Sequence, residues 1–475
     1  MINQVRKAKK MKSLSNLKII IAGFALISLQ SCFVAKEYEQ PEVVQEERFH
    51  TDNIEQDSLN IANVSWREMF TDPVLQEYIE KGLQNNIDIR IALQQIIAAE
   101  AYVKQGKAGY LPTLNGDATF THQELSENSQ FGSFFSSVNQ YQLSAGLSWE
   151  ADIWGKIRSQ KRAFEASYLQ SIAAHQAVKT RLIASIASTY YQLLALDEQI
   201  RITQETVKTR EKSLDATQAL KEAGNLTEVG VKQTEAQYYT AKAILIDLKN
   251  EERLLENTLS ILLGEAPMQI ERTSLDEQQI TTELNIGVPV QLLRNRPDVI
   301  AAEYELMNAF ELTNVARSNF YPSLTLSATG GLQALEAEDL FSVNSLFATV
   351  IGGLAQPILN GRRIRTEFEV SQAQQEQARL EFRRAILTAS KEVSDALYSY
   401  QASTEKIEVK QKEFEAYDLA TGYSEELLVN GLANYLEVLT ARENALNSSL
   451  DLTNARFNQL KAIVELYEAL GGGWQ

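Results

Sequence analysis

An internal repeat is the feature that most constrains this chain. Landmarks in the first half return in the second half in the same order, at an offset of 206 to 210 residues. Five landmarks at a nearly constant offset indicate two copies of one structural unit of about 200 residues each. The matched segments are Asn86-Ile87-Asp88-Ile89 with Arg296-Pro297-Asp298-Val299, Tyr110-Leu111-Pro112-Thr113-Leu114 with Phe320-Tyr321-Pro322-Ser323-Leu324, Gly155-Lys156 with Gly361-Arg362, Gly224 with Gly431, and Leu263-Gly264 with Leu470-Gly471.

Each copy contains a long helical tract. No proline lies between Pro112 and Pro267 or after Pro357, so both tracts lack the strongest helix breaker. Apolar residues recur in them every seven residues, which is typical of supercoiled helices that pack side by side. A glycine interrupts each tract, so we expect two long antiparallel helical hairpins with a glycine at each tip. The heptad residues are Ile186, Leu193, Ile200, Val207 and Leu214 in the first copy, and Ile386, Val393, Tyr400, Ile407 and Phe414 in the second.

Short helices at about 74–108 and 298–318 precede two candidate strands in each copy. Apolar and polar residues alternate in the segments 114–121, 141–150 and 324–329, which predicts one apolar and one polar face. The strands are about ten residues long, the length that crosses a bilayer when tilted. Four strands cannot close a barrel, and lipid does not tolerate an open sheet edge, so several protomers must pool their strands. A small soluble β-sandwich is the alternative.

The N-terminus has the pattern of an export signal. A basic region, residues 1–18, precedes an apolar run from Ile19 to Leu29 that is too short to span a bilayer comfortably. Ser31 and Cys32 follow, and this is the only cysteine in the chain. The pattern resembles the lipobox of bacterial lipoproteins, although Gln30 replaces the usual small residue. We predict acylation of Cys32, including palmitate, with a signal peptide that is not lipidated as the alternative.

These signals define the predicted organisation of the chain. The segments are a signal peptide at 1–31, an N-terminal tether at 32–73, a first repeat at 74–265 with strands at about 113–122 and 139–151 and a hairpin at about 156–263, an inter-repeat linker at 266–297, and a second repeat at 298–475 with strands at about 323–333 and 345–356 and a hairpin at about 362–470.

Composition argues against several functions. The formal net charge is −17, and an acidic chain repels the phosphate backbone of nucleic acids. Three widely spaced histidines and one cysteine make a metal site improbable. The sequence has no phosphate-binding glycine loop and no serine-hydrolase motif, and the glycine run at 471–473 ends a helix. We therefore predict a protein that is not an enzyme and that has no cofactor.

Two motifs carry a family resemblance. Trp66 followed by Phe70-Thr71-Asp72-Pro73-Val74-Leu75 resembles a W…F-x-D-P-x-L opening. The segment from Leu292 to Glu303 resembles the signature L-L-x-x-R-P-D-V-x-x-A-E, and is the more specific of the two. Nearly the whole mature chain is similar to the lipoprotein branch, NodT- or OprM-like, of the TolC-like outer-membrane efflux factors. We assign a structural role to Arg296, Pro297 and Asp298, because Pro297 suits a first helical turn and Asp298 its N-terminal dipole.

The resemblance implies a fold and a set of partners. It implies a mainly α protein with a membrane β-barrel, in which a homotrimer forms a twelve-stranded barrel continued by an α-helical barrel. Such a channel conducts small molecules passively from the periplasm to the outside. A periplasmic adaptor protein would join it to an inner-membrane pump, usually of the resistance-nodulation-division type. Localisation would be the outer membrane, in contact with its lipid and with a long periplasmic extension.

The resemblance also implies site residues at the hairpin tips. The tips would close the periplasmic end and dock the adaptor, and they are Gly224-Asn225-Leu226-Thr227 and Gly431-Leu432-Ala433-Asn434. Glu437 would form a ring of three carboxylates that attracts cations at the narrowest point. A second acid found in some relatives is replaced here by Thr440. The alternative for Glu437 is a solvated surface charge near a loop.

Two other functions stay open at this point. One is the outer-membrane channel of a type I protein secretion system, which would share the fold but serve a different pump. The other is a structural periplasmic coiled-coil lipoprotein, which would lack membrane-spanning strands. The clean alternation at 141–150 argues against the second.

Overall fold

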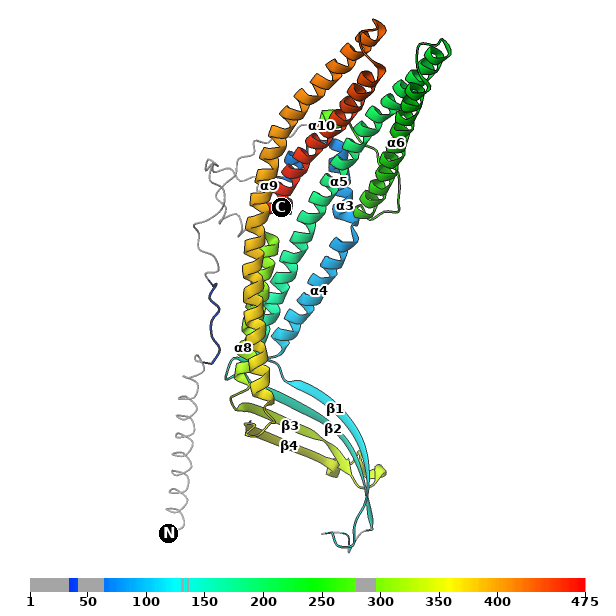
Figure 1. The fold of residues 1–475 in the computed structure, drawn as a ribbon. Helices are drawn as coiled ribbons and strands as arrows, with labels where there is room; N and C mark the ends of the chain where they lie inside the picture. Colours follow the sequence, from blue (N-terminus) through cyan, green and yellow to red (C-terminus); the bar gives the residue numbers. More distant parts are fainter. Residues whose placement is uncertain are drawn as a thin grey trace, which may run out of the picture. The chain divides into compact units, whose positions relative to one another are not determined.

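The computed structural model describes residues 34–41, 64–129, 132, 134, 136–278 and 296–474 (Figure 1). Contacts divide the chain into two compact units. The first, which we call the strand unit, comprises Met1–Glu42, Ile96–Gln170 and Ala302–Phe382, and the second, the hairpin unit, comprises Val43–Gln95, Ser171–Ala301 and Arg383–Gln475. Each unit takes segments from both repeats, so the compact units do not follow the predicted division into a first and a second repeat.

The strand unit contains one antiparallel sheet in the order β1-β2-β3-β4. Each predicted strand is present, with ends within two residues of the prediction. The strands are β1 (Thr113–Glu124), β2 (Ser137–Ala151), β3 (Ser323–Ala334) and β4 (Leu346–Ala355). The central pair, β2 with β3, joins the two repeats, while β1 and β4 each have one partner strand among the described residues.

Register gives the sheet one apolar and one polar face. Leu114 pairs with Leu147, Leu147 with Ala328, and Ala328 with Val350, which places an apolar row across all four strands. The neighbouring row, on the opposite face, is polar or small and consists of Asn115, Gly146, Thr329 and Thr349. Directly paired residues share a face, so the alternation read from the sequence survives pairing. Leu114 and Val350 are exposed, so no described part of the chain covers the apolar face at either edge.

Four helices continue from the strands. They are α4 (Ile87–Ala108), α5 (Lys156–Glu222), α8 (Pro297–Ser318) and α9 (Arg363–Val429). At 67 residues, α5 and α9 run from one compact unit into the other, which is why the units cut across the repeats. No helix in the described part of the chain carries an apolar stretch long enough to cross a membrane.

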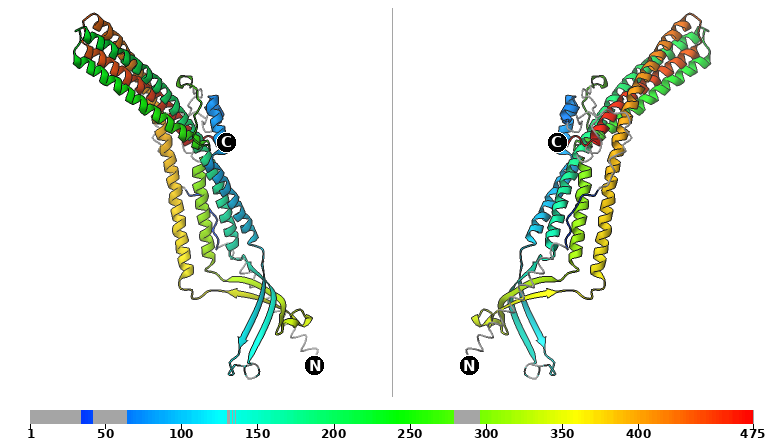
Figure 2. Two further views of the ribbon diagram at one scale, coloured as in Figure 1. Left: turned by 90° about the vertical axis from the view of Figure 1, so that its right-hand side faces the viewer. Right: turned by 90° about the vertical axis from the view of Figure 1, so that its left-hand side faces the viewer.

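The hairpin unit pairs each long helix with a shorter return helix. Helix α6 (Glu228–Leu262) returns from the tip of α5, and α10 (Tyr435–Ala469) returns from the tip of α9 (Figure 2). The short helices α2 (Trp66–Met69) and α3 (Pro73–Asn85) and the 3₁₀ helix η3 (Leu275–Glu277) complete the unit.

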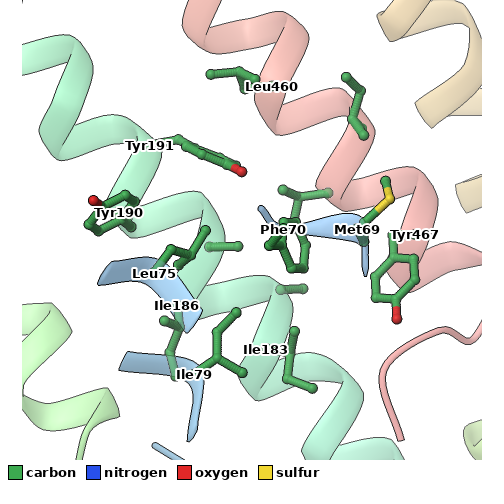
Figure 3. Packing of buried hydrophobic residues seen from close by; sticks show 14 of the residues in the cluster. Met69, Phe70, Leu75, Ile79, Ile183, Ile186, Tyr190, Tyr191, Leu460 and Tyr467 are labelled. Atoms are coloured by element: carbon green, nitrogen blue, oxygen red, sulfur yellow. The ribbon is translucent and has the colours of Figure 1, made fainter. Parts of the chain in front are cut away.

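The core of the hairpin unit lies where α2 and α3 pack on α5 and α10. Phe70 is fully buried and meets Tyr191 and Tyr467 at ring-centroid distances of 6.5 and 5.8 Å (Figure 3). The heptad residues Ile186 and Leu193 are fully buried in the same cluster. The heptad pattern therefore marks core positions here, whereas Val207 and Leu214, nearer the tip, are only partly buried.

The segment 74–108, expected as one helix, is two helices. Asn86 separates α3 from α4 because its carboxamide oxygen accepts hydrogen bonds from the amides of Asp88 and Ile89, at 2.9 and 3.2 Å. Its amide nitrogen donates to the carbonyl of Leu262, 2.9 Å away. An asparagine that caps one helix and holds a distant one overrides local helix propensity.

The predicted tether and linker are more ordered than expected where the structure describes them. The tether was assigned to 32–73, yet Trp66, Met69 and Phe70 are core residues. Likewise, the linker segment 266–278 is fixed by Arg272, which forms ion pairs with Asp197, Glu252 and Glu256 at 2.5, 2.5 and 2.9 Å.

Candidate functional site

The two hairpin tips share one turn geometry. Gly224 and Gly431 both have positive φ angles, 79° and 71°. The next amide in each tip donates back to a carbonyl five residues earlier, Asn225 to Leu220 and Leu432 to Leu427, both at 2.9 Å. This is the Schellman ending, which needs a left-handed residue and favours glycine. The sequence therefore placed the tips correctly at Gly224 and Gly431.

Both return helices begin with a capped residue. Thr227 caps α6 by accepting from the amide of Gly230, and Asn434 caps α10 by accepting from the amide of Glu437 at 3.1 Å. The carboxylate of Glu437 in turn accepts a hydrogen bond from the Asn434 side-chain amide at 2.8 Å, which holds the capping side chain in place. In this protomer, Glu437 thus stabilises the start of a helix, a local role that the Asn434-to-Glu437 spacing already indicates.

Most of the other tip residues are exposed. Thr440 of α10 is exposed, and its hydroxyl donates to the Leu436 carbonyl. Among the tip residues, Asn225 and Leu432 are exposed, whereas Leu226 and Ala433 are half-buried. Exposed apolar side chains gather near the tips and are the kind of surface that protein partners cover. They are Val229, Val429, Leu432 and Leu436.

A buried arginine ties the two hairpins together behind the tips. Arg210 of α5 is 3% exposed, and its guanidinium donates to the Glu443 carboxylate of α10 at 2.7 Å. A second nitrogen donates to the carbonyl of Gln237 in α6, also at 2.7 Å. Three helices therefore meet at one side chain.

Arg442 of α10 connects this helix to α9 and α5. It forms an ion pair with Glu425 of α9 at 2.7 Å and donates to the Ser213 hydroxyl of α5. Together, Arg210 and Arg442 join all four helices behind the tips, and we call these two arginines with Glu443 and Glu425 the arginine clasp. None of its four residues is among the predicted site residues.

A sequence signal for the clasp does exist. Thr203, Arg210 and Thr217 lie seven residues apart on α5, and all three are buried. A buried polar residue at every heptad is unusual in a coiled coil and often fixes register. Within this polar row, Arg210 makes the contact with the second hairpin, through Glu443.

The signature residues Arg296 and Asp298 form a structural brace. Arg296 is buried and pairs with Asp298 and with Glu392 of α9, both at 2.7 Å. It also donates to the carbonyl of Ala469 near the end of α10, at 2.8 Å. Burial opposes the ionised carboxylate, but the hydrogen bond and charge of Arg296 outweigh it and lower the pKa of Asp298. Pro297 is the first residue of α8, as predicted.

The predicted lipidation site, Cys32, lies outside the described residues, as do residues 292–295 of the signature. The segment just after the cysteine is described. The backbone of Lys36 exchanges two hydrogen bonds with the side chain of Asn314 on α8, at 3.2 and 3.0 Å. Tyr38 packs edge-on against Phe310 of the same helix. Residues 34–41 therefore dock along α8.

Solved structures identify the class of protein that this fold defines. The outer-membrane channel OprN superposes with a TM-score of 0.85 at 24% identity, covering 93% of this chain and all of that one. The open state of the MtrE outer-membrane channel of Neisseria gonorrhoeae superposes with a TM-score of 0.82 at 25% identity, covering 94% and 99%. CusC gives 0.81 at 25% identity, covering 93% and 100%. The fold is that of an outer-membrane channel.

A family profile makes the assignment specific. The profile described as "Outer membrane efflux protein" matches residues 78–265 and 288–472. The chain belongs to the outer membrane efflux protein family, a transport family, and it is an outer-membrane efflux channel. The two matched segments correspond to the two repeats.

Curated relatives match along nearly their whole length. The solvent efflux pump outer membrane protein SrpC of Pseudomonas putida is 27% identical over 457 residues, covering 95% of this chain and 97% of the relative. The cation efflux system protein CusC of Escherichia coli is 26% identical over 456 residues, covering 94% and 97%. The probable efflux pump outer membrane protein TtgC of P. putida is 29% identical over 422 residues, covering 87% and 86%.

Proposed function

We propose that three copies of this chain form a passive efflux channel that closes at the hairpin tips. The sheet carries the proposal. It is a single layer with one apolar face, and its outer strands β1 and β4 each have one partner strand among the described residues. A four-stranded sheet cannot close on itself, and lipid excludes open edges, so neighbouring protomers supply the missing partners.

The internal repeat suggests where protomers meet. Within one chain, the segment just before β3 in the second repeat packs against the loop after β2. Trp154 of that loop stacks on Tyr321 with ring centroids 4.9 Å apart, and its indole donates to the Pro322 carbonyl at 2.7 Å. The equivalent loop after β4 is uncovered, and Leu359 is 96% exposed. In the first repeat, the segment just before β1 carries Leu111 in the place of Tyr321, and Leu111 is 66% exposed. The counterpart of Trp154 is Asn360, so repeat symmetry places the loop 359–360 of one protomer beside Leu111 of the next.

Thiol crosslinking tests this assembly. In a variant carrying Leu111→Cys and Leu359→Cys, a short bifunctional thiol reagent should yield covalent trimers on denaturing gels. The matched control places cysteines at Trp154 and Tyr321, where the reagent should link positions within one chain and leave the monomer. Monomer alone from the first pair, with efficient internal linkage in the control, would refute the pairing.

The gate proposal rests on the tips and on Glu437. Three tip carboxylates around one axis would attract cations and resist closer approach by repulsion. Because the Glu437 carboxylate also holds the Asn434 side chain that caps α10, the informative change is Glu437→Gln, which removes the charge and keeps an acceptor for Asn434. The variant Glu437→Ala removes both the charge and the acceptor for the Asn434 side chain, and it keeps the backbone amide that Asn434 caps.

Single-channel conductance in planar bilayers separates these roles. We expect cation-selective openings in the wild type, reduced selectivity in Glu437→Gln, and reduced selectivity together with more frequent opening in Glu437→Ala. Equal selectivity in all three would move the constriction away from Glu437 and leave the channel intact. A silent wild type is resolved by Gly431→Pro, which disrupts the tip and should open a closed channel. Silence there as well would refute conduction.

Anchoring and partners complete the proposal. We assign acylation to Cys32, supported by the docking of residues 34–41 along α8, whose C-terminal end leads into β3. The exposed apolar tips suit a periplasmic adaptor that couples the channel to an inner-membrane pump of the resistance-nodulation-division type. The relatives' names mention solvents, toluene, cations and antibiotics, so small molecules are the proposed cargo. Radiolabelled palmitate should label the wild type and spare Cys32→Ser.

A further inference from the structure

The hairpin unit contains a cleft that the channel function does not use. Its volume is about 330 Å³, at the small end of the range for ligand pockets. Four segments line it: α5, the start of α8, α9 and the end of α10. We call it the acidic cleft because five carboxylates and two guanidiniums line it. These charged residues are Asp298, Glu392, Asp395, Glu465, Glu468, Arg181 and Arg296.

Most of these charges already have partners. Arg296 is committed to Asp298, Glu392 and the Ala469 carbonyl. Asp395 pairs with Lys391, and Glu465 pairs with Lys461 at 3.5 Å. The Arg296 guanidinium is therefore saturated, and it offers little to an anion, which leaves Arg181 as the one arginine of the cleft without an ion pair among the described residues.

Three side chains at the cleft, Thr180, Arg181 and Glu468, form no hydrogen bond or ion pair among the described residues, although the charge of Arg181 acts on Glu468. Thr180 lines the wall of the cleft and is only 7% exposed, yet its hydroxyl makes no hydrogen bond. Most threonines on these helices return their hydroxyl to a carbonyl of the preceding turn, as Thr189 and Thr206 do. A buried hydroxyl without a partner is costly, and it points to a group that supplies one. Glu468, on the facing helix α10, likewise forms no ion pair within the described part of the chain.

We propose that the acidic cleft binds a small organic cation that carries N–H donors, such as a primary ammonium. The ammonium donates to the carboxylate of Glu468, and the Thr180 hydroxyl accepts a further N–H. An excess of acids over arginines favours a cation over an anion. No three His, Cys, Asp or Glu side chains of the described residues converge closely enough to hold a metal ion, which favours an organic cation.

The electrostatics of the cleft agree with this choice. Burial is the main cause that raises the pKa of Glu468 to about 7, helped by the nearby Glu392 and Glu465 and opposed by Arg181 and Arg296. An ammonium partner stabilises the ionised carboxylate, so affinity should increase as pH rises through about 7. Asp298 and Asp395 complete the charged groups that face this carboxylate.

Isothermal titration of the full-length trimer in detergent tests the proposal, with 1,4-diaminobutane as the probe and 1,4-butanediol as its uncharged match. We expect saturable binding of the diamine at one site per chain and none of the diol. Glu468→Gln should weaken binding roughly tenfold, the ratio expected when one charge-assisted hydrogen bond is lost. The control Asp451→Asn changes an acid of the same helix outside the cleft and should leave the affinity unchanged.

Thr180→Val gives a second readout. It should weaken diamine binding without lowering the thermal stability of the unliganded protein, and should raise that stability if anything, because the hydroxyl has no partner to lose and its burial is costly. Three results would overturn the proposal: no saturable diamine binding, equal binding by Glu468→Gln, or saturable binding of inorganic phosphate that disappears in Arg181→Gln. A large stability loss in unliganded Thr180→Val would also overturn it, by showing that the hydroxyl is already satisfied.

Discussion

Breaking the arginine clasp on its acidic side should loosen the hairpins more than breaking it on its basic side. Arg210 is 3% exposed, whereas the Glu443 side chain is 35% exposed. Changing Glu443→Gln leaves a buried guanidinium without a counter-charge. Changing Arg210→Met leaves a carboxylate that water can reach and fills the space with an apolar chain.

The magnitudes follow from this asymmetry. Removing one partner of a fully buried pair costs about 3–5 kcal/mol, and the partial exposure of Glu443 lowers the expected cost of Glu443→Gln to about 2–3 kcal/mol. We expect about 1 kcal/mol for Arg210→Met, and the double variant should resemble that single variant, since the two changes are coupled. Glu205→Gln, in the exposed pair with Arg201, is the control and should cost under about 0.5 kcal/mol.

Hydrogen exchange of α10 amides in the assembled channel measures the local opening free energy directly. Loss of protection should be greatest in Glu443→Gln and accompanied by more frequent opening in bilayers. The reasoning is refuted if Arg210→Met exchanges faster than Glu443→Gln, or if the two single costs simply add. Faster exchange without altered opening would assign the clasp to stability and remove it from gating.

Three further predictions rest on single groups. Burial raises the pKa of Glu468 to about 7, so the stability that its protonated form contributes is lost as pH rises through that value. The melting temperature should therefore fall between pH 5.5 and pH 8, and Glu468→Gln should remove the part of this fall that is due to Glu468. Burial opposes ionisation of Asp72, but hydrogen bonds from Thr273, Gln278, Leu75 and Tyr190 outweigh it and lower its pKa. The stability that the ionised carboxylate provides is therefore lost only as pH falls below about 4. At neutral pH, Asp72→Ala should lower the free energy of unfolding in urea by about 2–3 kcal/mol. Gly224→Ala and Gly431→Ala should each cost about 1 kcal/mol from backbone strain alone, since an added Cβ would meet nothing within 4 Å. An unchanged rate of amide hydrogen exchange at the tips would contradict the assigned turn.

Much of the fold could be predicted because its signals are local or periodic. Alternation located the strands, heptads located the hairpins, and Gly224 and Gly431 located the tips. The offset of 206 to 210 residues revealed that the chain is built twice. Asn86 was the exception within the helices: its side chain caps α4 locally, and it also contacts Leu262, 176 residues away, which a local pattern does not encode.

The candidate site was less predictable. The capping pair of Asn434 and Glu437 is local, and its spacing was available to a reader of the sequence. The clasp was not, because whether Arg210 meets Glu443 depends on the rotation and axial offset of two helices that are 233 residues apart in sequence.

The sequence by itself therefore determined the repeated unit, the kind of each element and the position of the tips, because short-range periodicity and chain stereochemistry encode them. Only the tertiary structure decided which polar groups face each other. The acidic cleft shows this most clearly, since Thr180 and Glu468 lie 288 residues apart and become neighbours of one cavity only when α5 and α10 pack. A heptad specifies which face of a helix is buried, but not which side chain of another helix stands opposite.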